Sequence, residues 1–402
     1  MEMGRKLGIL LMLTAMVTLM TGCWDKMEIK QLVIAVGLGI DKVGNDYLVS
    51  VQVVNPNELG VNSKGSGEAP VTVYKGTGKT VFEAIRKLTN TTPRKLYFSH
   101  LRIFVVGEET ARREGLGKII EFVSRDHELR ADFDIIVAKD LKATTVIESL
   151  SVIDKIPAQN LFSTLELSSK QWASTSTVKI DDLIDELMTE GSSLVVTGVR
   201  LKGDKPELNK KGIFETTSPP ARLEYDGLAV FNKDKLIDWL DKDESKGYNY
   251  VQNKVKGTVG TIRCPNQSGR LSIEVLDSKS DIHIRKENEK QHLGIRIRAE
   301  GNIDEVQCEI DLMKPGEISE LEQFIEEEIK SFIQKALNKE YAIKADLLGL
   351  GKRIHQLKPS LWKELKQDWS NHLQEIPVEI NVDFKLRETG KTKNSFLDKM
   401  KE

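Results

Sequence analysis

Residues 32–54 read LVIAVGLGIDKVGNDYLVSVQVV, and this stretch sets the fold class of the first half of the chain. An apolar run, Leu32 to Ile40, is followed after a short polar segment by a second apolar run, Tyr47 to Val54. The segment between them contains the turn Val43-Gly44-Asn45-Asp46. Short runs rich in β-branched residues on either side of such a turn are typical of a hairpin. The stretch therefore predicts two paired strands.

The residues that follow alternate between strand and helix patterns. Thr80 with Glu83 three residues later is a capping box that predicts the start of a helix. The predicted order is a strand at 71–74, a helix at 81–88, a strand around 100–106, a helix from 108 to about 124, a strand at 132–138 and largely helical residues at 142–190. Strands alternating with helices predict an α/β sandwich.

Period-two patterns return after residue 191 and predict a β-meander. The predicted strands are 194–201, 222–231, 258–263, 271–285 and 293–301, with a short helix at 234–240. A second capping box, Ser319 with Glu322, opens a long amphipathic helix. Another helix begins at Pro359 and carries Trp362 and Trp369 on one face, where we expect them in the core. The alternating segment 378–386 predicts a last strand.

The first residues are typical of an export signal. Glu2, Arg5 and Lys6 precede the apolar run Leu7 to Met20, which is shorter than the roughly 20 apolar residues that a spanning helix needs. The segment Leu19-Met20-Thr21-Gly22-Cys23 resembles a bacterial lipobox.

This resemblance implies cleavage between Gly22 and Cys23, which removes residues 1–22 as a lipoprotein signal peptide. It also implies that Cys23 becomes an S-diacylglycerol cysteine whose new amino group is open to acylation. Two acyl chains are enough for stable anchoring, whereas a single chain binds only marginally. The alternative is an ordinary secretory signal with a coincidental cysteine.

Composition excludes several classes of protein. The chain has 402 residues with 59 Lys and Arg against 61 Asp and Glu, so a nucleic-acid partner is not expected. Three cysteines exclude a disulfide scaffold and a multi-cysteine zinc module. Cys264 and Cys308 could form a bridge on export, but we expect two separate thiols, because the sequence does not show that they are close.

Motifs for catalysis are broken or missing in the sequence. Gly37-Leu38-Gly39 lacks the third glycine of a dinucleotide fingerprint, which is Lys42 here, and Gly78-Lys79-Thr80 lacks the first glycine of a phosphate loop, which is Val73. The six histidines include no pair with the i, i+4 spacing of a helical metal site, and His100 is expected to be a structural or interface residue. The sequence therefore predicts no enzyme, no metal and no cofactor.

Several segments together resemble one family, the Ger(x)C lipoproteins, which are the C subunits of GerA-type spore germinant receptors. The matching segments are Gly22-Cys23-Trp24-Asp25, Glu28-Ile29, Gly39-Ile40-Asp41, Ser99-His100-Leu101-Arg102, Gly107-Glu108-Glu109, Arg130 to Asp134, Gly227 to Phe231 with Lys235-Leu236, Ala345 to Gly351, Pro359, Trp362-Lys363 and Trp369. They span nearly all of the mature chain, and their combination is more specific than any one of them.

The resemblance implies an α+β protein of three mixed α/β domains. The sequence pattern gives compatible regions: an N-terminal α/β sandwich at 23–190, a small middle domain at 191–255, a C-terminal β-meander with long helices at 256–390, and a polar tail at 391–402. The resemblance also implies a non-enzymatic subunit that docks on integral membrane A and B subunits and supports germination in response to nutrients. Its expected location is the outer face of the cell membrane, which in spores is the inner spore membrane.

Two other functions remain open from the sequence. The first is a lipid-anchored solute-binding protein that captures a small nutrient directly. The second is an exported hydrolase, which would need a nucleophile and a base that the sequence does not display.

Overall fold

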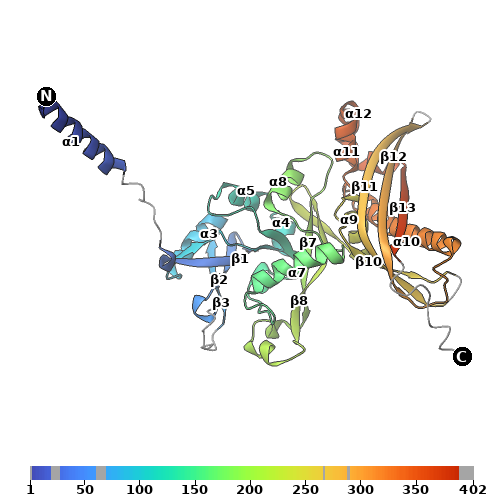
Figure 1. Cartoon of the computed structure of the whole chain (residues 1–402), viewed down its shortest axis with the longest axis horizontal. Coiled ribbons are helices and arrows are strands. Elements are labelled where there is room, and N and C mark those ends of the chain that lie inside the picture. Colours follow the sequence, from blue (N-terminus) through green and yellow to red (C-terminus); the bar gives the residue numbers. More distant parts are fainter. Residues whose placement is uncertain (1, 20–27, 60–68, 266–267, 288–289, 389–402) are drawn as a thin grey trace.

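The chain folds around two β-sheets, which lie side by side in Figure 1. The computed structural model describes residues 2–19, 28–59, 69–265, 268–287 and 290–388. Within them, the first sheet has nine strands and the second has four, and helices pack against both. The predicted α+β class is confirmed.

The predicted hairpin forms one side of the first sheet. Strand β1 (Leu32–Val43) pairs antiparallel with β2 (Asp46–Val54), which pairs with β3 (Val71–Gly78). The turn between β1 and β2 contains Gly44, whose φ of +59° suits a residue without a β-carbon.

The centre of the first sheet is parallel. Strand β1 is followed in the sheet by β5 (Ile103–Gly107), β6 (Asp134–Ala138) and β7 (Val195–Gly203), and the short β4 (Lys95–Tyr97) also pairs with β1. Two antiparallel strands, β8 (Ala221–Asn232) and β9 (Lys235–Leu240), complete the sheet. The sheet order is β3-β2-β1-β5-β6-β7-β8-β9.

Strand β9 corrects the predicted helix at 234–240. Lys233, with a φ of +54°, lies in the tight turn that pairs Asn232 with Lys235, so the chain returns as a hairpin strand. Leu236 and Leu240 are both buried, and a spacing of four residues places two side chains on one face in a helix and in a strand alike. The sequence pattern alone therefore could not separate the two structures.

Helices cover both faces of the first sheet, which confirms the predicted sandwich. Helices α3 (Val81–Lys87), α5 (Gly117–Arg125) and α8 (Ile180–Met188) pack on one face, and α6 (Ala143–Ile147) and α7 (Pro157–Gln171) pack on the other. The single helix predicted from 108 is divided into α4 (Glu108–Arg113) and α5. Gly115 lies between them with a φ of +83°, a conformation that ends a helix.

The second sheet contains the last three strands of the predicted meander, whereas the first two predicted strands, 194–201 and 222–231, belong to the first sheet as β7 and β8. Strands β10 (Thr258–Arg263), β11 (Arg270–Glu287) and β12 (Lys290–Val306) are antiparallel neighbours, and β13 (Val378–Glu388) then pairs parallel to β12. The long helix α10 (Pro315–Ile343) packs against β13 and against α9 (Lys242–Val251). It begins at Pro315 rather than at the predicted capping box, because proline has the φ of a first helical residue.

The helix predicted from Pro359 is broken into short pieces. The pieces are α12 (Pro359–Leu365), the 3₁₀ turn η5 (Lys366–Asp368) and α13 (Trp369–Glu375). A further helix, α11 (Leu350–Leu357), lies between α10 and Pro359. Trp362 and Trp369 are both buried, and their ring centroids are 5.3 Å apart, so their predicted place in the core is confirmed.

Cys264 and Cys308 form a disulfide, so the expectation of two separate thiols was wrong. The pairing follows from the meander, because β11 pairs with β10 on one side and with β12 on the other. Arg263 lies opposite Arg270, and Leu271 lies opposite Val306, which brings the end of β10 close to the end of β12. The two Cα atoms are 6.3 Å apart.

The remaining described elements are short or lie before the first sheet. They are α1 (Glu2–Leu19), α2 (Pro56–Leu59) and the 3₁₀ turns η1 (Ile29–Gln31), η2 (Leu88–Asn90), η3 (Lys205–Glu207) and η4 (Lys211–Glu215). Among the described helices, none has both the length and the apolar character needed to cross a membrane. The predicted boundary at 190/191 stays a prediction; β6 and β7, on either side of it, are neighbours in one sheet. The predicted tail at 391–402 lies outside the described residues.

Candidate functional site

The predicted lipid attachment site, Gly22 and Cys23, lies outside the described residues. The described chain resumes at Glu28, passes through η1 and enters β1. The other signature segments are described, and most of them lie in three places: the carboxyl ends of the parallel strands, the opposite edge of the same sheet, and the junction with the C-terminal helices.

Asp41, from the segment Gly39-Ile40-Asp41, is a buried helix cap near the end of β1. Its Oδ1 accepts a hydrogen bond from the backbone N–H of Ala143 at 2.8 Å. Its Oδ2 accepts bonds from the N–H and the hydroxyl of Thr144 at 2.9 and 2.7 Å. The carboxylate thus satisfies donors at the first turn of α6, which would otherwise lack partners.

Glu108, from the segment Gly107-Glu108-Glu109, is also fully engaged. Its carboxylate accepts hydrogen bonds from the backbone N–H of Asp140 at 2.7 Å and from the Trp239 indole and Arg112 at 2.9 Å each. Burial raises the pKa of Glu108, but these three donors outweigh burial and hold the pKa below its usual value. The residue joins β5, β6 and β9 through charge-assisted bonds.

A pocket of about 500 Å³ opens beside these two residues. Its wall includes Lys42 at the end of β1, Glu108 after β5, and Asp140 and Lys142 after β6. In open α/β sheets, ligands bind outside the carboxyl ends of the parallel strands, which is where this pocket lies. The wall carries charges of both signs, so it could hold a small polar molecule.

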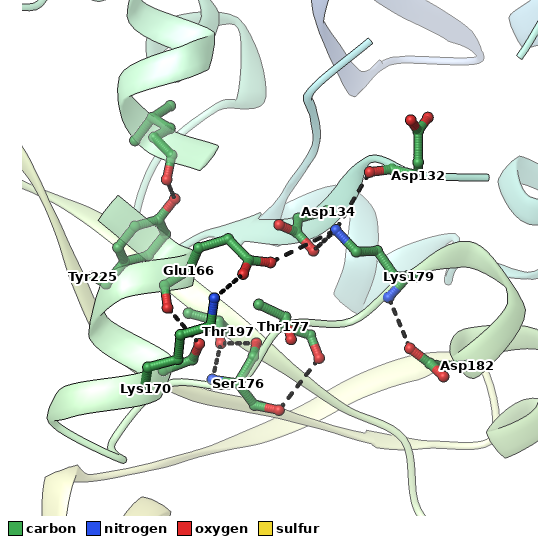
Figure 2. A network of polar contacts seen from close by, with 12 residues as sticks. Asp132, Asp134, Glu166, Lys170, Ser176, Thr177, Lys179, Asp182, Thr197 and Tyr225 are labelled. Atoms are coloured by element: carbon green, nitrogen blue, oxygen red, sulfur yellow. Dashed lines mark hydrogen bonds and ion pairs between the residues drawn. The ribbon is translucent and has the colours of Figure 1, made fainter. Parts of the chain in front are cut away.

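A buried ion pair lies at the opposite edge, where the parallel strands begin. Asp134, the first residue of β6, has no exposed surface, and its Oδ1 lies 2.7 Å from Nζ of Lys179 (Figure 2). Apart from Lys179, no hydrogen-bond partner for either oxygen is found in the described part of the chain. Burial raises the pKa of Asp134 to about 6, although the lysine opposes this shift.

Lys179 connects two signature segments at this edge. Its ammonium also donates to the backbone oxygen of Asp132 at 3.3 Å and lies 4.9 Å from the centre of the Phe162 ring. The guanidinium of Arg102 lies 5.4 Å from the same ring. The segments 99–102 and 130–134 therefore meet over α7, where one aromatic side chain contacts two cations.

His100 is exposed in the loop before β5, with its ring 5.8 Å from that of Tyr97. Over the described residues, no group of three or more His, Cys, Asp or Glu side chains is placed to hold a metal ion. The predicted structural or interface role of His100 stays a prediction.

Two buried carboxylates lie at the junction with the C-terminal helices. Asp346 accepts hydrogen bonds from the backbone N–H groups of Leu350 and Gly351 at 2.8 and 2.6 Å. Burial raises the pKa of Asp346 to about 6, against the effect of these donors. Glu340 accepts a bond from the N–H of Leu348 at 2.7 Å, and burial together with the nearby Asp346 raises its pKa well above the usual range.

The same loop holds the segment between α8 and β7. The backbone N–H of Ser193 donates to the carbonyl of Asp346 at 2.9 Å, and that of Lys352 donates to the carbonyl of Gly191 at 2.7 Å. Gly191 has a φ of +75°, and a β-carbon there would approach the Trp362 ring to 2.7 Å. The signature 345–351 therefore fixes how the first sheet meets the C-terminal helices.

Polar side chains reinforce this junction at its surface. The indole N–H of Trp362 donates to Glu190 at 3.0 Å, and Lys366 lies 3.3 Å from the same carboxylate. A pocket of about 540 Å³ adjoins these residues, and Met188 on its wall is 80% exposed.

The sequence did not reveal the roles of Glu190 and Glu340 or the pairing of Asp134 with Lys179. The one available signal for the pair was Asp134 itself, a charged residue at the start of the apolar run 134–138.

Comparison with known proteins matches both halves of the chain. Residues 25–201 match the family model described as spore germination protein N-terminal domain, and residues 226–390 match the model described as spore germination B3/GerAC like, C-terminal. Together these two regions cover most of the sequence. The chain therefore belongs to the GerAC-like family of spore germination proteins, the C-type subunits of germinant receptors.

Curated relatives in Bacillus subtilis (strain 168) agree with this assignment. Spore germination protein KC is 29% identical, with all of both chains covered. Spore germination protein B3 is 23% identical over 93% of this chain and 96% of the relative. The crystal structure of the GerBC protein has 18% sequence identity and a TM-score of 0.52, covering 87% of this chain and 96% of that one, so the fold is shared.

Proposed function

We propose that the chain is a lipid-anchored, non-enzymatic receptor subunit that docks on integral membrane subunits and supports the germination response to nutrients. One observation carries this proposal. The signature residues Asp41, Glu108 and Asp346 each use their carboxylate to join separate elements of the fold. Groups engaged in this way serve a rigid scaffold, whereas a catalytic site needs groups aimed at a substrate.

The anchor in this proposal is Cys23, carrying a diacylglycerol at the outer face of the membrane. Anchoring confines the protein to the membrane surface and raises its effective concentration near the A and B subunits, so weak contacts suffice for docking. The charge balance of the chain supports this reading, because no net basic charge is available to hold the whole protein on a membrane.

Replacing the anchor cysteine tests the proposal. Cys23→Ala should release the protein from the membrane fraction and impair germination with nutrients, while Thr21→Ser, which keeps the cysteine, should change neither. Crosslinking of the wild-type protein in membranes should then recover the integral subunits. Membrane fractionation and germination that both stay normal in Cys23→Ala would refute the proposal.

A second candidate function is direct capture of a small nutrient. The pocket at the carboxyl ends of β1, β5 and β6 favours it, because Lys42, Asp140 and Lys142 present both charge signs to a ligand. Calorimetric titration of the mature chain with amino acids and sugars tests this function. A heat of binding that disappears in Lys142→Gln would establish capture, and no heat with any of these solutes would exclude it for them.

A further inference from the structure

The first strand enters the fold close to the proposed lipid anchor. Five residue steps separate Cys23 from Glu28, and five residues span at most about 18 Å even when fully extended. The 3₁₀ turn η1 follows directly and leads into Leu32, the first residue of β1. If Cys23 carries the lipid, as proposed above, the start of β1 is held near the headgroups.

This start of β1 projects beyond the body of the sheet. Strand β5 joins β1 only at Gly37, so residues 32–34 have β4 as their paired neighbour. In this parallel pair Leu32 lies opposite Lys95 and Ile34 lies opposite Tyr97. The part of the fold nearest to the anchor is therefore a narrow, two-stranded projection.

The side chains on this projection suit a membrane interface. Val33 packs against the main core of the sheet, and the alternation of a strand turns Ile34 to the other face, where it is 36% exposed. Tyr97 is half-buried opposite Ile34. An aromatic residue with a hydroxyl beside an exposed aliphatic residue is the pairing that favours the boundary between water and lipid.

Two cations flank these residues. Lys30, in η1, and Arg94, directly before β4, are both exposed, and neither has a carboxylate partner among the residues that the structure describes. Lys95, by contrast, pairs with Glu128 at 2.6 Å. Lys30 and Arg94 are therefore open to an external anion, although the chain as a whole is slightly acidic.

We propose that Lys30, Ile34, Arg94 and Tyr97 form an anchor-proximal surface that lies on the bilayer and binds the phosphates of anionic phospholipids. The cations contact the headgroups, and Ile34 and Tyr97 sit at the level of the glycerol backbone. This contact orients the sheet relative to the membrane, which a single lipidated cysteine cannot do. The surface deepens the proposed function and rests on the lipid at Cys23.

A fluorescent label close to this surface tests the proposal in the mature, lipidated protein. Lipid occupies the thiol of Cys23 and a disulfide occupies Cys264 and Cys308, so a cysteine introduced at Asn90 would be the sole reactive thiol. Asn90 is exposed at the end of η2, four residues before Arg94. The matched control is Lys363→Cys on α12, which lies far from α3 along the long axis (Figure 1).

The protein is placed in vesicles of phosphatidylcholine, with or without phosphatidylglycerol, that carry an energy-acceptor lipid. Transfer from position 90 should be strong with phosphatidylglycerol and weaker without it, and transfer from position 363 should be weak in both. With the label at 90, Lys30→Gln and Arg94→Gln should each shift the ratio of docked to undocked protein about fivefold, the effect of one cation at an anionic surface. Lys363→Gln should leave the ratio unchanged.

Two results would overturn the proposal and are distinguishable. In the first result, the chain floats with the vesicles, but transfer is equal from positions 90 and 363, or it does not change with phosphatidylglycerol or with either substitution. Such a chain keeps its anchor and lacks this surface. A mature chain that does not float at all refutes the anchor and the surface together.

Discussion

The indole Nε1 of Trp369 lies 2.9 Å from Oδ2 of Asp346, and both residues are buried. This bond connects the first residue of α13 to the loop that ends α10, so it closes the C-terminal helices around the junction. Trp362 makes the corresponding bond to Glu190, whose side chain is 55% exposed. Both tryptophans thus donate through the indole N–H, but the acceptor of Trp369 is buried, whereas the acceptor of Trp362 is largely exposed.

Trp369→Phe should destabilise the protein more than Trp362→Phe. Removing the donor to Asp346 leaves a buried carboxylate short of a partner, which costs about 1.5–3 kcal/mol, whereas water can replace the donor to Glu190. Urea unfolding of both variants gives the two free energies of unfolding. Equal losses would mean that burial of the acceptor does not matter here.

Stability should rise as the pH falls from neutral, in part because of Asp134. The pKa of Asp134 is about 6 in the folded protein and near 3.8 in the unfolded chain. At a pH between these two values, the folded state therefore binds a proton that the unfolded state does not bind. The resulting stabilisation is complete below the unfolded pKa and is lost as the pH rises through about 6. At about 1.4 kcal/mol per pKa unit, it amounts to at most about 3 kcal/mol.

The check is the difference in unfolding free energy between pH about 4.5 and about 7. This difference should shrink in Asp134→Asn, which cannot ionise, and should stay as in the wild type in Asp181→Asn, a change at an exposed position of α8. A difference that Asp134→Asn leaves intact would place the pH dependence elsewhere.

Asp41→Ala should cost about 2 kcal/mol or more. The change leaves the N–H groups of Ala143 and Thr144 without their acceptor at a buried helix start. Asp41→Asn is the matched control, because it keeps one acceptor oxygen and nearly the same volume. Thermal unfolding should rank the wild type above Asp41→Asn and Asp41→Asn above Asp41→Ala; the same transition temperature for both variants would contradict the capping role.

Loss of the disulfide should cost about 4 kcal/mol, the loop-closure estimate for a sequence separation of 44 residues. The double variant Cys264→Ser/Cys308→Ser tests this value by urea unfolding. Reductant should destabilise the wild type to the same extent and leave the double variant unaffected. Equal free energies of unfolding for the oxidised wild type and the double variant would show that the bond adds nothing to stability.

Local patterns in the sequence predicted most of the elements. The hairpin at 32–54, the meander and the last strand follow from alternation and turn residues, which act over a few positions. The helix predicted at 234–240 was wrong, because a hairpin turn at Lys233 decides that segment and its apolar spacing fits both structures.

Contacts between distant residues could not be predicted in the same way. Asp134 and Lys179 meet because β6 and the start of α8 lie side by side, and no local pattern records this. The disulfide likewise depends on the register of three strands. The role of Asp41 is similar: the signature marked the residue, and only the fold shows that it caps a helix about one hundred positions away.

The place of β13 has a consequence for how the protein matures. Residues 378–388 complete the second sheet by pairing with β12, and Phe384 fills its core. Because this parallel partner comes after four intervening helices, β12 keeps an open edge until nearly the whole chain has been synthesised. A chain cut short before 378 would present that edge to proteases and to other copies of itself, so the second sheet is closed only when the last strand is in place.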